Sequence, residues 1–69
     1  MIEVFKTNIQ ETEAANSIIA LLLQRFPGTM VNIDLHDCDK VLRVEGNDFL
    51  PAAIVQIVND NGFLCGILE

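Results

Sequence analysis

The stretch MVNIDLHDCDKVLRVE, residues 30–45, decides the fold of this chain. Apolar and polar side chains alternate over residues 30–35 and again over residues 40–45, which is the pattern of a strand that buries one face. The polar segment 36–39 between them is short enough to connect neighbouring strands. The stretch therefore predicts a β-hairpin in the middle of the sequence.

On both sides of this hairpin the apolar period changes to that of a helix. Apolar residues recur at spacings of three and four over residues 12–26, and the Pro-Gly pair at 27–28 is expected to end this helix. Asn8 or Thr12 is expected to cap its start. Helical spacing returns over residues 49–58. The sequence thus predicts one amphipathic helix before the hairpin and one after it.

The ends of the chain supply two more strands, expected at residues 2–6 and 63–68. Right-handed connections interleave the two strand-helix-strand units into one sheet. The predicted fold is α+β: a ferredoxin-like βαββαβ sandwich of one domain, residues 1–69, whose four-stranded antiparallel sheet has the order 4-1-3-2 with both helices on one face. The expected core residues are Ile18, Ile19, Leu22, Ile33, Leu42, Val44, Ile54 and Ile57.

Composition narrows the functional classes. The chain has 69 residues, a formal net charge of −6 and only four basic residues, which are scattered along the sequence. Nucleic-acid binding requires several cations on one surface and is therefore not expected. The start of the chain lacks the pattern of a signal peptide, and the longest apolar run, residues 18–23, is too short to enter a membrane. A cytoplasmic protein with reduced cysteines is expected.

The element order and the segment IVQIVNDNGF, residues 54–63, resemble the heavy-metal-associated domains, a family of small metallochaperones and of N-terminal modules in copper and zinc ATPases. The resemblance implies the ferredoxin-like fold. In that family a Met-x-Cys-x-x-Cys loop between the first strand and the first helix binds the metal. The matching segment here is KTNIQET, residues 6–12, which contains no cysteine. The resemblance therefore supplies no metal ligand at that loop.

One other segment contains several possible metal ligands. His36 and Cys38, flanked by Asp37 and Asp39, are the ligands expected if the chain binds a heavy metal. Turn chemistry is a second explanation for the aspartates, because Asp side chains bond to their own backbone in turns. Cys65 is expected to pack as a small apolar residue, without a disulfide to Cys38.

The sequence gives no support for catalysis. His36 is the only histidine, and no nucleophile has a base at a known motif spacing. We therefore expect a non-enzymatic protein without a cofactor.

The sheet face opposite the helices is the strongest functional candidate in the sequence. Phe5, Val41 and Arg43 are expected on it, as an apolar patch with charged neighbours. The leading hypothesis is a module that binds a protein partner or self-associates through this face or through an edge strand. The alternatives are a heavy-metal-binding protein with a degenerate site and a domain that senses a small ligand at the loops between helices and sheet.

Overall fold

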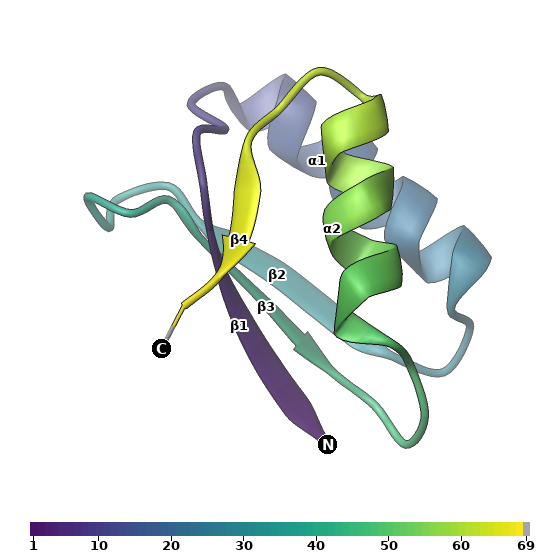
Figure 1. Cartoon of the computed structure of the whole chain (residues 1–69). Helices are drawn as coiled ribbons and strands as arrows, with labels where there is room; N and C mark the ends of the chain where they lie inside the picture. The colour runs from purple at the N-terminus through teal and green to yellow at the C-terminus, as the bar shows by residue number, and fades with distance from the viewer. Residues whose placement is uncertain (69) are drawn as a thin grey trace.

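A computed structural model describes residues 1–68. Its sheet has the order β2-β3-β1-β4 with antiparallel neighbours, which confirms the predicted 4-1-3-2 order, counted from the opposite edge. Both helices lie on the same face of the sheet (Figure 1), so the fold is the predicted ferredoxin-like sandwich. The elements are β1 (Ile2–Thr7), α1 (Thr12–Arg25), β2 (Met30–Asp34), β3 (Val41–Glu45), α2 (Pro51–Asp60) and β4 (Cys65–Ile67).

The central strands β1 and β3 determine which side chains face the helices. Phe5 lies opposite Leu42 in the β1–β3 register, and Leu42 lies opposite Ile33 in the β2–β3 register. Phe5 and Leu42 are fully buried. Because side chains alternate along a strand, their neighbours Val4 and Arg43, which also form a pair, point to the opposite, open face.

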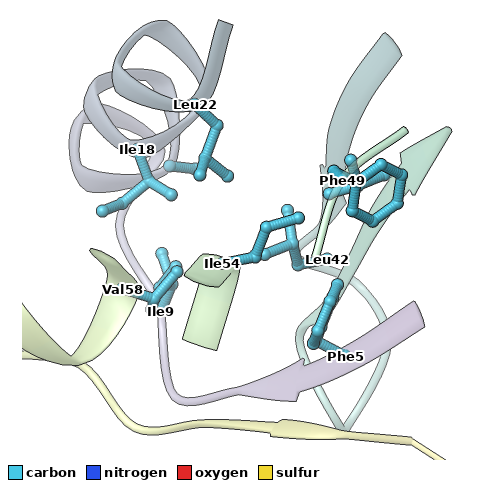
Figure 2. Packing of buried hydrophobic residues seen from close by; sticks show 10 residues of the cluster. Phe5, Ile9, Ile18, Leu22, Leu42, Phe49, Ile54 and Val58 are labelled. Atoms are coloured by element: carbon cyan, nitrogen blue, oxygen red, sulfur yellow. The ribbon is translucent and has the colours of Figure 1, made fainter. Parts of the chain in front are cut away.

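The core fills the space between the sheet and the helices, and Figure 2 shows its side chains converging from both layers. Five of the expected core residues, Ile18, Leu22, Leu42, Val44 and Ile54, are buried. Ile19, Ile33 and Ile57 are only half-buried. The structure adds five buried residues: Phe5, Ile9, Ala15, Phe49 and Val58.

The helix ends differ in part from the prediction. Glu11 is the N-cap of α1, and its side chain makes no capping hydrogen bond, so the expected cap at Asn8 or Thr12 is wrong. The side chain of Asn8 instead accepts a hydrogen bond from the backbone of Leu64, at 2.8 Å. At the end of α2, Gly62 has a φ of 92°, a left-handed conformation that glycine adopts at little cost. Within residues 1–68, neither helix combines the length and the apolar character needed to cross a membrane.

Candidate functional site: the open sheet face

The open sheet face is the side of the sheet that neither helix covers (Figure 1). Leu64, just before β4, lies beside it and is 71% exposed. The open face consists of Leu64 and of the strand residues that point to this side, as the strand registers and the alternation of side chains determine. These residues are Ile2, Val4 and Lys6 of β1; Met30, Asn32 and Asp34 of β2; Val41, Arg43 and Glu45 of β3; and Gly66 of β4.

Large apolar side chains on this face are accessible to solvent. Met30 is 66% exposed and Ile2 is 50% exposed, while Val4 and Val41, on the two central strands, are half-buried. An apolar surface of this kind, spread over neighbouring strands, is typical of a contact site rather than of isolated exposed residues. Val41, which lies opposite Asp34, is on the open face, where the sequence predicts it.

Phe5 corrects the predicted set. The sequence predicts it on the open face together with Val41 and Arg43, but its side chain is fully buried in the core. The physical reason is the strand register, because Phe5 lies opposite Leu42 and partners across a ladder point to the same side. Ile2, Val4 and Met30 belong to the open face, although the sequence pattern does not single them out.

The charges of the open face cancel. Arg43 forms an ion pair with Glu45 at 3.4 Å between Nη2 and Oε1, and the ammonium of Lys6 offsets the carboxylate of Asp34 in total charge. Both members of the ion pair have side chains that are 41% exposed, so solvent screens the attraction and the pair contributes little to stability. The net charge of −6 therefore comes from other parts of the chain.

The second candidate site is the loop between β2 and β3. Ligand atoms of Asp37, Cys38 and Asp39 lie within 4.8 Å of one another. Within residues 1–68, the group does not include the imidazole of His36. The backbone N–H of His36 donates a hydrogen bond to the side chain of Asp34 at 3.0 Å. The structure thus places the expected ligand Cys38 in a cluster but separates it from His36. The side chain of Asp37 accepts a hydrogen bond from the backbone of Asp39 at 2.8 Å, as expected of a turn.

Hydrogen bonds connect this loop with Thr7, the last residue of β1, and through it with the segment between β1 and α1. The backbone N–H of Thr7 donates to the carbonyl of Asp39 at 3.0 Å, and the hydroxyl of Thr7 donates to the carbonyl of Lys40 at 2.6 Å. The same hydroxyl oxygen accepts a bond from the backbone of Ile9 at 3.2 Å. The two loops therefore meet at one end of the sheet.

Cys65 lies at this end of the sheet, in β4. It is opposite Thr7 in the β1–β4 register and, together with Asn8 and Gly66, lines a shallow cavity of about 380 Å³. Partial burial raises the pKa of the Cys65 thiol to about 11, because burial disfavours the charged thiolate. Both cysteines are free thiols, as expected. The thiol of Cys65 is therefore protonated near neutral pH, which makes it a weaker nucleophile than an ordinary cysteine.

Comparison with known proteins defines the fold. No family model matches the sequence. No curated protein matches it either. Among solved structures, the chain is similar to the yeast copper transporter domain Ccc2a, determined in apo and Cu(I)-loaded states, with a TM-score of 0.74 and 21% sequence identity. The match covers 99% of this chain and 94% of the yeast domain. At this identity the similarity establishes a shared fold, that of the heavy-metal-associated domains, and no more.

Proposed function

We propose that this protein is a non-enzymatic interaction module and that its open face binds a partner protein. One observation carries the proposal: three large apolar side chains, Ile2, Met30 and Leu64, are each at least 50% exposed on the layer that no helix covers. Interfaces combine an apolar centre with a polar, charge-balanced rim. The half-buried Val4 and Val41 supply that centre.

The charge distribution indicates the chemistry of the partner. Ten acidic residues stand against four basic ones, two of which, Lys6 and Arg43, lie on the open face itself. The rest of the protein surface is acidic, whereas the charges of the open face cancel. The open face can therefore bind an apolar surface without burying an unpaired charge. A basic periphery on the partner would steer the encounter. We propose a partner protein with an apolar patch framed by lysines and arginines.

A lysine in the middle of the open face tests this proposal. Val41→Lys places an ammonium group opposite Asp34, its cross-strand neighbour, so the sheet tolerates the substitution. In a protein interface the same ammonium group would be removed from water, and the cost of this desolvation exceeds the attraction to Asp34. The matched control is Ala52→Lys, at an exposed position of α2, which makes the same change in net charge away from the face.

The measurement is affinity capture from an extract of the source cells with quantitative mass spectrometry. We expect a protein that the original chain and Ala52→Lys retain equally and that Val41→Lys loses. Its identity is confirmed by titration of the two purified proteins. If no protein distinguishes Val41→Lys from Ala52→Lys, the open face is not a binding surface and the proposal fails.

The second candidate function is heavy-metal binding, favoured by the cluster of Asp37, Cys38 and Asp39. Its ligands are a soft thiolate and two hard carboxylates on adjacent residues, whereas tight zinc sites draw four converging ligands, usually from separated positions. We therefore propose that any zinc binding here is weak and not stoichiometric. Isothermal titration of the protein and of Cys38→Ser with zinc tests this, and a tight one-to-one site lost in Cys38→Ser would reverse the order of the two candidates.

A further inference from the structure

Strand β2 forms one outer edge of the sheet, because in the order β2-β3-β1-β4 it pairs only with β3. Sheet edges are usually protected from pairing by lysine, proline, a bulge or a very short strand. Strand β2, MVNID, contains neither lysine nor proline, and its register with β3 runs without interruption from Met30 to Asp34. The opposite edge, β4, has three residues. Of the two edges described, β2 is the longer, and its one charged residue, Asp34, stands at the end of the strand rather than in its middle.

We propose that β2 pairs antiparallel with β2 of a second copy, in a register centred on Asn32. This pairing places Asn32 opposite Asn32, Val31 opposite Ile33, and Met30 opposite Asp34. A two-fold axis perpendicular to the sheet relates the copies, so the helices of both lie on the same side and every pair of partners points to the same face, as an antiparallel ladder requires. The result is one continuous sheet of two copies.

The side chains of β2 are complementary to themselves in this register. On the helix side, the apolar Val31 meets the apolar Ile33, and both are still half-buried rather than buried at the open edge. On the other side, the two Asn32 amides can donate to and accept from each other. The one charged residue of the strand, Asp34, meets uncharged Met30. No like charges are placed opposite each other, which would destabilise a cross-strand pair.

The helix above this edge supports a second copy as the partner. Helix α1 packs over β2, and residues 14–24, AANSIIALLLQ, contain no charged side chain. The outer surface of an exposed helix ordinarily carries charged side chains. In this chain of net charge −6, the outer surface of α1 instead presents uncharged residues, among them the apolar Leu23, which is 41% exposed. Pairing of β2 brings the two α1 helices side by side, and their uncharged surfaces can approach without the repulsion that other contacts between two acidic molecules would meet.

Charge substitutions at the centre of the register test the proposal on the full chain. Asn32→Asp and Asn32→Lys each place two like charges opposite each other in a homodimer, whereas an equimolar mixture of the two places opposite charges together. Asn32 is exposed, so the fold tolerates both. The matched control is Asn47→Asp, which makes the same change at an exposed loop position away from the edge. The probe is the protein itself, measured by sedimentation equilibrium over micromolar to millimolar concentration.

We expect the original chain and Asn47→Asp to form dimers with equal dissociation constants. Each Asn32 variant alone should dimerise at least ten-fold more weakly, and the mixture should recover the original affinity. A monomeric original chain at millimolar concentration, or Asn32 variants that dimerise as the original does, overturns the proposal. This pairing uses the edge rather than the open face, so a dimer lost in Val41→Lys but kept in Asn32→Asp would refute it. The proposed function has its own test, the loss of the captured partner protein in Val41→Lys, which Asn32→Asp should leave unchanged.

Discussion

Replacement of Ile54 by alanine tests whether the stability of this chain depends on one core between the sheet and the helices. Ile54 is fully buried on α2 and its side chain points into the cluster between the layers in Figure 2. The substitution removes three buried carbons, which is about 2.4 kcal/mol of transfer free energy at about 0.8 kcal/mol per group. The cavity that remains adds to this, so we expect a loss of about 3 to 4 kcal/mol.

Ile67→Ala is the matched control, because it removes the same three carbons from a side chain that is 47% exposed. About half of Ile67 is in contact with water in the folded protein, so only about half of the transfer free energy is lost on substitution, and the expected loss is about 1 kcal/mol. A domain of this size has a total unfolding free energy of about 3 to 10 kcal/mol. Ile54→Ala therefore removes a large share of the total, and Ile67→Ala a small one.

Urea unfolding followed by far-UV circular dichroism is the appropriate assay, because the chain contains no Trp and no Tyr for fluorescence. Thermal unfolding supplies a second measurement, with a shift of about 4 to 8 °C for each kcal/mol. Equal losses for Ile54→Ala and Ile67→Ala, or a loss below about 0.5 kcal/mol for Ile54→Ala, would refute the assignment of α2's apolar stripe to the core.

Three further outcomes are expected. Gly46→Ala should lower the unfolding free energy by about 1 to 3 kcal/mol in urea unfolding, because a Cβ at Gly46 would lie 2.7 Å from Cγ2 of Thr29. The hydroxyl of Thr29 donates a hydrogen bond to a carbonyl, which keeps this side chain from moving away. An unchanged unfolding midpoint would contradict the prediction. Cys65 holds its proton more strongly in the folded protein, so the stability that this thiol contributes is complete below pH 9 and is lost as the pH rises toward 11. This fall in the unfolding free energy with pH should be absent in Cys65→Ser. Zinc at a total concentration of about 100 μM should raise the unfolding free energy by no more than about 0.5 kcal/mol, because a weak site with a Kd of about 100 μM is then only half occupied. A larger rise that is lost in Cys38→Ser would contradict the proposed order of functions.

The fold was predictable because its signals are local. The change from alternating to helical spacing at each end of residues 30–45 determines the element order, and the handedness of the connections leaves few ways to arrange six elements. The two predicted helices and four predicted strands occur within a few residues of their expected ends. The helices and strands are therefore predictable from short-range periodicity, which is visible in a single sequence.

The open face was predictable only in part because its membership depends on pairing between distant segments. In β1 both faces contain apolar residues: Ile2 and Val4 on one, Phe5 on the other. Nothing within the strand decides which face is buried, and the register that sets Phe5 opposite Leu42 is a long-range property. Ile9 was missed for a similar reason, since a single apolar residue in a polar loop has no periodicity, although the structure buries it completely.

The loop between β1 and α1 shows how the shared fold is held in this chain. In the heavy-metal-associated domains that the sequence resembles, this loop carries the metal-binding cysteines. Here the end of β1 and the loop after it make structural contacts: Thr7 bonds to the end of the β2–β3 loop, Asn8 bonds to the backbone before β4, and Ile9 is buried in the core. These contacts join the three segments at this end of the sheet. The side chains of Thr7, Asn8 and Ile9 thus hold the fold together, whereas the open face and the β2 edge keep apolar side chains and unpaired backbone groups available for binding, which is why we propose the function there.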